Sequence, residues 1–188
     1  MTSGLVPFRV GEAFEGDEHL TVLGKKLKVG QQAPDFWLQH IQRGGDGSIK
    51  TVSLGQLEGM VRIISPINAI ETQVCKKETD HWIELLDLLP YGAGVLVVST
   101  ETVFTLGRWQ QDIGTSRVVL LSDFIHRRFG VDYGVLIKEW GLLQRAVFVI
   151  DPHGRLAYVE YVKDQMVEPD YEAAIAAAKA VGPKGADG

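Results

Sequence analysis

The side chain in this sequence that is best suited to chemistry is its single cysteine, Cys75. It lies between an apolar run at residues 61–67 and a helical pattern at residues 76–89. This order predicts a buried strand followed by a helix that carries the thiol in its first turn. A helix N-terminus favours negative charge, and the thiolate is the nucleophilic form of cysteine. Cys75 is therefore the candidate catalytic residue.

A hydroxyl three residues before the cysteine supports the same interpretation. As the N-cap of the helix, Thr72 is expected to accept a hydrogen bond from the backbone N–H of Cys75. Glu71 is expected in the first helical turn, where the helix dipole favours an acid, and Glu78 also opposes the positive charge of the lysines between them. No arginine nearby in the sequence offers a positive group that could polarise an oxygen–oxygen bond.

Each of these residues also has a purely structural interpretation. A lone cysteine is more often a small buried hydrophobic residue than a catalyst. A threonine at the start of a helix is more often only a cap. A structural protein with an inert buried thiol therefore stays open as an alternative.

Composition limits the classes of protein to consider. The chain has 188 residues, which predicts one domain over residues 1–181, and the Gly-rich end at residues 182–188 predicts a disordered tail. The net charge of −5 gives no basic surface for nucleic acid or an anionic membrane, and no apolar stretch reaches the roughly 20 residues of a membrane span. The five histidines lack metal-ligand spacing, so we expect no metal and no cofactor. One cysteine and no recognisable signal peptide favour a reducing, cytoplasmic setting.

The elements that must position the thiol alternate along the chain. The pattern predicts an N-terminal β-hairpin and then strands and helices in the order β-α-β-α-β, followed by a second hairpin and a last helix. Crossover connections make the first strands of this series parallel, and the second hairpin adds an antiparallel partner. We therefore predict an α/β protein with a thioredoxin-like fold, in which a central mixed sheet has helices on both faces. The expected elements are the hairpin 8–27, strands 35–40, 61–65, 93–99 and 117–122, helices 76–89, 100–111 and 123–129, the hairpin 146–161 and the helix 170–181.

Segment 68–75, Asn-Ala-Ile-Glu-Thr-Gln-Val-Cys, resembles the active-site pattern Pro-Ser-Ile-Asp-Thr-x-Val-Cys of the peroxiredoxins, and within them of the thiol peroxidase subfamily. The resemblance spans roughly residues 14–181. It is carried by the segments 23–36, 121–123, 129–139, 142–151, 158–162 and 168–174.

The resemblance implies a role for three residues. Cys75 would be the peroxidatic cysteine, Thr72 would position thiolate and peroxide, and Arg145 would supply the missing positive group. The implied function is a thiol-dependent peroxidase that reduces hydrogen peroxide or organic hydroperoxides through a sulfenic acid at Cys75. The implied partners are the peroxide substrate and an external thiol reductant, either a thioredoxin-like protein or a small thiol. Family habit also implies a homodimer, for which Trp109 and Trp140 are candidate interface residues.

Two departures from the family pattern bear on this function. Asn68 stands where the family has the proline that shields the sulfur and shapes the peroxide pocket. The family's resolving cysteine falls in a segment resembling Arg-Trp-Cys-Gly, which here reads Arg108-Trp109-Gln110-Gln111. An intramolecular disulfide is therefore impossible, and turnover must follow a one-cysteine route. The alternative function is a catalytically weakened scaffold that acts as a redox sensor or a protein-binding module.

Overall fold

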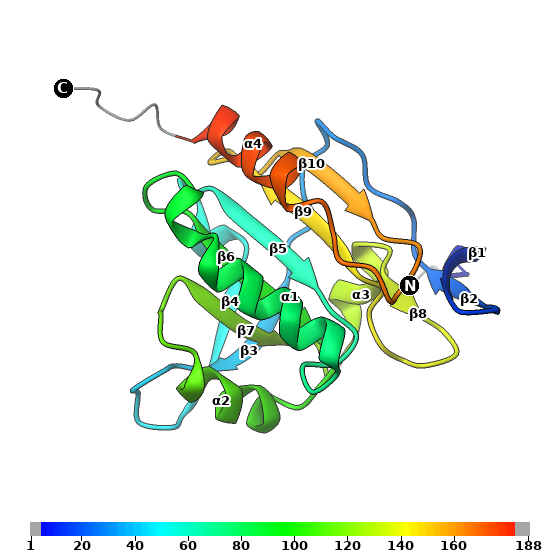
Figure 1. Ribbon diagram of the computed structural model, residues 1–188, viewed down its shortest axis with the longest axis horizontal. Coiled ribbons are helices and arrows are strands. Elements are labelled where there is room, and N and C mark those ends of the chain that lie inside the picture. The colour runs from blue at the N-terminus through cyan, green and yellow to red at the C-terminus, as the bar shows by residue number, and fades with distance from the viewer. Residues whose placement is uncertain (1–4, 183–188) are drawn as a thin grey trace.

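A seven-stranded mixed sheet forms the centre of the computed structural model, which describes residues 5–182. The strand order is β10-β9-β5-β6-β7-β3-β4, in which β6 runs parallel to β5 and β7 while the other neighbours are antiparallel (Figure 1). This arrangement confirms the predicted thioredoxin-like α/β fold. The strands are β3 (Trp37–Ile41), β4 (Ile49–Ser53), β5 (Arg62–Pro66), β6 (Gly94–Ser99), β7 (Val118–Ser122), β9 (Ala146–Ile150) and β10 (Leu156–Tyr161).

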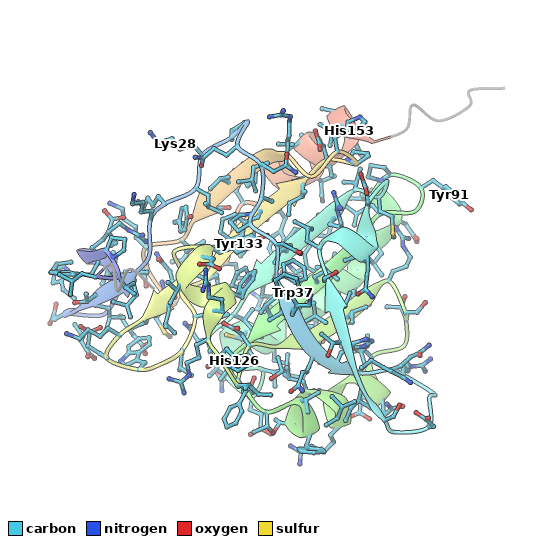
Figure 2. The ribbon with its side chains drawn as sticks, turned by 180° about the vertical axis from the view of Figure 1, so that it is seen from behind. Lys28, Trp37, Tyr91, His126, Tyr133 and His153 are labelled. Carbon is cyan, nitrogen blue, oxygen red and sulfur yellow. The ribbon has the colours of Figure 1, made fainter. Side chains whose placement is uncertain are left out.

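Helices cover both faces of this sheet, because its inner strands are apolar on both sides. Side chains of α1 (Gln73–Glu84), α2 (Val103–Asp112) and α4 (Tyr171–Val181) belong to the hydrophobic cluster on one face. The cluster on the other face includes residues of α3 (Arg128–Asp132) and of the segment after it, such as Tyr133. Figure 2, seen from behind, shows Tyr133 on this second face.

The predicted N-terminal hairpin is present as β1 (Phe8–Glu15) and β2 (Glu18–Leu23). It belongs to a separate three-stranded sheet with β8 (Leu136–Ile137), a strand too short for the sequence pattern to indicate. Gly24 directly follows β2 with a φ of +93°, and a Cβ there would lie 1.9 Å from the carbonyl oxygen of Val131. A residue without a side chain is therefore required where the hairpin meets the body of the protein.

The structure contains one further strand that the sequence pattern does not indicate, and two predicted helices begin later than expected. The added strand is β4, an edge strand whose largely exposed residues give no apolar alternation, followed by a 3₁₀ turn at Gly55–Leu57. α2 begins after Thr102, not Thr100, because the Thr102 hydroxyl accepts the N-capping hydrogen bond. The short helix predicted at residues 123–129 begins only at Arg128, because the Asp123 carboxylate turns back to accept hydrogen bonds from the N–H groups of Phe129 and Gly130.

The helix after the cysteine ends earlier than predicted, at Glu84, and a 3₁₀ turn at Leu86–Leu88 completes the segment. Residues 183–188, most of the predicted tail, lie outside the described residues, and the single domain over residues 1–181 stays a prediction. Among the residues that the structure describes, no helix is long and apolar enough to cross a membrane. In the same residues, no group of three metal-ligating side chains comes together.

Candidate active site

Cys75 lies in the first turn of α1, directly after the loop that leaves the buried strand β5. Thr72 is the N-cap residue, and its hydroxyl oxygen accepts a hydrogen bond from the backbone N–H of Cys75 at 3.4 Å. The cap geometry predicted from the sequence is therefore confirmed. Cys75 has no exposed surface, so the site around its sulfur is closed.

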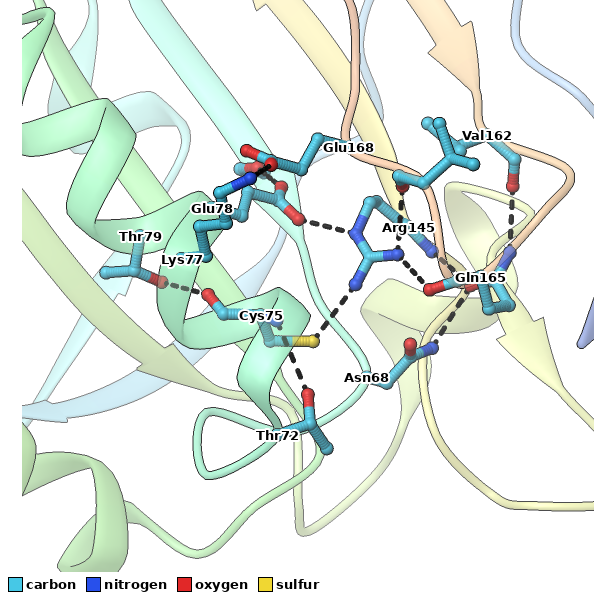
Figure 3. Close-up of polar contacts among 12 residues, drawn as sticks. Asn68, Thr72, Cys75, Lys77, Glu78, Thr79, Arg145, Val162, Gln165 and Glu168 are labelled. Atoms are coloured by element: carbon cyan, nitrogen blue, oxygen red, sulfur yellow. Dashed lines mark hydrogen bonds and ion pairs between the residues drawn. The ribbon is translucent and has the colours of Figure 1, made fainter.

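The positive group of the site comes from the far end of the chain. Arg145 directly precedes β9, which runs antiparallel to β5 with Ile64 opposite Phe148. This register, continued by three residues, brings Arg145 beside the loop that carries the cysteine. Its guanidinium Nη2 lies 3.2 Å from the sulfur of Cys75 and, like the sulfur, is fully buried (Figure 3). The structure thus brings together all three site residues expected from the sequence.

A buried carboxylate holds the guanidinium from its other side. Arg145 Nε donates to Glu78 Oε2 at 2.6 Å, and neither side chain has exposed surface. Glu78 Oε1 accepts from the hydroxyl of Ser65 at 2.5 Å, and that hydroxyl in turn accepts from Trp82 Nε1 at 3.0 Å. Each polar group in this series of hydrogen bonds, from the indole of Trp82 to the thiol of Cys75, therefore has a partner, as burial requires.

Burial and pairing act in opposite directions on the two charged groups. Burial raises the pKa of Glu78 to about 7, although Arg145 and Ser65 act to lower it. Burial lowers the pKa of Arg145, but the opposing effect of Glu78 and of Cys75 outweighs it, so that the pKa is raised overall. The guanidinium thus stays charged, whereas the ionised form of Glu78 is disfavoured because burial removes the water around it.

The backbone after β10 completes the enclosure of Arg145. Arg145 Nη1 donates to the backbone oxygens of Gln165 and Val167, and the Gln165 side-chain oxygen accepts from the N–H of Arg145 at 2.9 Å. Glu168 follows and pairs with Lys77 of α1 at 2.6 Å. The guanidinium is therefore fixed on all sides and presents its remaining Nη2 to the sulfur.

Asn68, at the position where the resemblance implies a proline, belongs to this enclosure. Its side-chain Nδ2 donates to the backbone oxygen of Leu143 at 2.6 Å and to the side-chain oxygen of Gln165 at 3.2 Å. The residue is only 8% exposed. The amide therefore ties the loop before the cysteine to the two segments that hold Arg145 (Figure 3).

A cavity of about 420 Å³ leads from the surface to this site. Thr72 and Arg145 belong to its lining, whereas Cys75 does not. Because Arg145 and Cys75 have no exposed surface, a small molecule in the cavity reaches them only when side chains of the lining move. The other lining residues are Glu15, Asn68, Gln73, Val74, Trp140, Leu142, Gln165 and Met166. The arrangement can activate a thiolate and hold a small oxygen-containing molecule in front of it.

Not every residue near the thiol behaves as the sequence suggested. Glu71 precedes the N-cap, so it is not the first-turn acid that we expected, and it forms an exposed ion pair with Arg108 of α2 at 2.8 Å. Glu78 does more than oppose the positive charge of the lysines, which is all that we expected of it, and no pattern in the sequence indicates Gln165. Glu78 could have been found from its position one helical turn after Cys75, since residues three apart share a helix face.

Trp109 and Trp140, the candidate interface residues, are both partly buried within the chain. Trp109 packs against the cluster on the α1 face, and Trp140 packs against the core of the N-terminal hairpin and lines the cavity. Both side chains therefore already have apolar partners within one chain. The homodimer stays a prediction.

Comparisons with known proteins agree on the family. The model of the AhpC/TSA family matches residues 29–159. A thiol peroxidase of Streptococcus agalactiae serotype III is 40% identical over 160 residues, which cover 85% of this chain and 93% of the relative. A thiol peroxidase of Streptococcus sanguinis is 41% identical over 162 residues, or 86% and 95% of the two chains. A crystal structure of a peroxiredoxin-like protein from Aquifex aeolicus superposes with a TM-score of 0.77 at 30% identity, and the match covers 92% of this chain and 98% of that one.

Proposed function

This chain belongs to the AhpC/TSA family, and we propose that it is a thiol peroxidase of the peroxiredoxin type in which Cys75 alone carries the redox chemistry. The observation that carries this proposal is the 3.2 Å approach of Arg145 Nη2 to the cysteine sulfur in a fully buried site. A fixed guanidinium stabilises a thiolate, and its position also suits the charge that develops on a peroxide as the oxygen–oxygen bond breaks.

The first half of the reaction uses the three residues together. The Cys75 thiolate attacks the terminal oxygen of the hydroperoxide, so that a sulfur–oxygen bond forms while the oxygen–oxygen bond breaks. The leaving oxygen takes up a proton and departs as water or an alcohol, and Cys75 becomes a sulfenic acid. Thr72 lines the cavity, and because its hydroxyl donates to the backbone oxygen of Ala69 at 3.0 Å, its oxygen can hold the attacked O–H group only as an acceptor, while Arg145 stabilises the transition state.

The second half requires an external thiol. With one cysteine in the chain, no internal thiol can condense with the sulfenic acid. An external thiol attacks the Cys75 sulfur, releases water and forms a mixed disulfide, which a second thiol reduces to regenerate Cys75. Because the sulfur is fully buried, the first turn of α1 must open to admit this thiol. We propose a cytoplasmic setting, since a reducing compartment supplies such thiols.

The second candidate function is a redox sensor or a protein-binding module on the same scaffold. The buried sulfur favours it, since a sulfenic acid that external thiols reach slowly persists as a signal. Steady-state turnover separates the two functions. A peroxidase consumes many equivalents of peroxide with a thioredoxin-like protein or a small thiol, whereas a sensor is oxidised once and recovers slowly.

The test of the common first step is the intact mass of the protein after brief exposure to substoichiometric peroxide with a sulfenic-acid trap. Stoichiometric trapping that is absent in Cys75→Ser is the expected result. Absence of trapping with both hydrogen peroxide and an alkyl hydroperoxide, in folded protein with a verified free thiol, would overturn the proposed function.

A further inference from the structure

The side chain of Asn68 has one polar atom that the enclosure of Arg145 does not use. Its Nδ2 is fixed as the donor, because the backbone oxygen of Leu143 at 2.6 Å can only accept. The other atom, Oδ1, accepts no hydrogen bond from the residues that the structure describes. It is also not sealed in the protein interior, since Asn68 lines the cavity and Oδ1 is not among the buried polar atoms without a partner. A carboxamide that is only 8% exposed therefore offers a free acceptor to the cavity.

The cavity fixes which end of a substrate this acceptor meets. Thr72, Arg145 and Asn68 line the cavity, whereas Cys75 does not. A hydroperoxide that points its terminal oxygen toward the sulfur must therefore leave its other oxygen, with whatever that oxygen carries, in the cavity where Asn68 lies. In hydrogen peroxide this second oxygen carries a hydrogen, whereas in an alkyl hydroperoxide it carries carbon.

We propose that Asn68 is a specificity-determining residue of this chain, whose Oδ1 accepts a hydrogen bond from the second O–H of hydrogen peroxide. This inference rests on the proposed peroxidase function. A proline at the same position has no side-chain acceptor, so the substitution found here adds an interaction that only a substrate with two O–H groups can form. An alkyl hydroperoxide instead leaves the amide oxygen without a partner against carbon, which disfavours it further.

The structural role of Asn68 has to be separated from this selectivity. Asn68 Nδ2 and the N–H of Arg145 share the side-chain oxygen of Gln165, so loss of Asn68 also loosens the segment that holds the guanidinium. Such loosening lowers the reaction with every hydroperoxide by a similar factor. Loss of the proposed hydrogen bond lowers the reaction with hydrogen peroxide alone.

The experiment is the ratio of second-order rate constants for oxidation of Cys75 by hydrogen peroxide and by tert-butyl hydroperoxide. It is measured for the wild type, Asn68→Leu and Asn68→Pro, with Gln165→Met as the control that loosens the same segment but keeps Asn68. We expect the ratio to fall roughly 2- to 12-fold in both Asn68 variants, the range for one neutral hydrogen bond. The control should lower both rate constants and keep the ratio.

This experiment distinguishes an error in the peroxidase function from an error in the role of Asn68. If the wild type reacts with neither hydroperoxide, the peroxidase function itself is wrong. If the wild type reacts and the ratio is the same in the Asn68 variants as in the wild type, the peroxidase function stands and the role of Asn68 is only structural. If circular dichroism shows that one of the two Asn68 variants is unfolded, Asn68→Ala takes its place. The ratio of rate constants is then compared between the folded variants and the wild type.

Discussion

Replacing Arg145 by methionine should separate what this side chain does for stability from what it does for chemistry. Arg145 and Glu78 form a fully buried ion pair at 2.6 Å. Removing one partner of such a pair leaves the other charge buried alone, which costs about 3–5 kcal/mol of the free energy of unfolding. The pKa of Glu78 is about 7 with Arg145 lowering it, so without Arg145 it rises further; the carboxyl group then takes up a proton at neutral and low pH, which moderates this loss.

The same substitution removes the guanidinium from the sulfur of Cys75, which lies 3.2 Å away. A hydrogen bond to a charged group contributes about 1.5–3 kcal/mol, so the rate constant for oxidation by peroxide should fall about 10- to 150-fold. The assay is rapid quenching with a sulfenic-acid trap and intact mass, beside urea unfolding of the same preparation.

The double variant Glu78→Gln/Arg145→Met distinguishes the two effects. It removes the uncompensated carboxylate but keeps an acceptor for the hydroxyl of Ser65, so more than half of the lost stability should return. The oxidation rate should stay low, because no positive group faces the sulfur. If the rate returned together with the stability, the reasoning would be refuted, and Arg145 would act only by holding the fold.

Three further outcomes follow from named contacts. Thr72→Val removes the N-cap, so we expect a loss of about 1 kcal/mol of stability by urea unfolding together with slower oxidation of Cys75, whereas Thr72→Ser should retain both. Burial raises the pKa of Asp123 from 3.8 to about 6, so the stability of wild type relative to Asp123→Asn is highest below about pH 4 and declines as the pH rises through 6. Urea unfolding over this pH range should show a decline of about 3 kcal/mol, and a constant difference would contradict it. The pair of Glu71 and Arg108 is exposed, with 59% and 69% of the two side chains accessible, and a double-mutant cycle should give a coupling below about 1 kcal/mol.

The sequence was sufficient for the parts of the site that are local along the chain. Thr72 and Cys75 are three residues apart, so helix geometry alone predicts the hydrogen bond between them. Buried strands such as β5 and β6 were equally clear, because an apolar run of strand length needs no knowledge of its neighbours. The strand β4 was missed for the opposite reason, since an exposed edge strand has no apolar pattern.

Contacts between distant segments could not be derived in this way. Arg145 is 70 residues from Cys75, and only the resemblance to a family selected it among the arginines of the chain. Gln165 is another 20 residues further on, in a loop whose composition carries no signal. Such contacts depend on the order of strands in the sheet, here on β9 lying beside β5, and a single sequence does not specify that order.

The two halves of the proposed cycle place opposite demands on the burial of Cys75. Attack on the peroxide gains from a closed site, because the guanidinium of Arg145 acts more strongly on the thiolate when water is excluded. The sulfur has no exposed surface, so each reactant needs some opening, and reduction requires the wider one because an external thiol is bulkier than a peroxide. The first turn of α1 is held by the Thr72 cap and by the contact of the sulfur with Arg145, whereas the second turn is anchored by the buried pair of Glu78 with Arg145. Opening for the external thiol is therefore confined to the first turn, because breaking the buried pair costs several kcal/mol whereas a helix cap contributes about 1 kcal/mol.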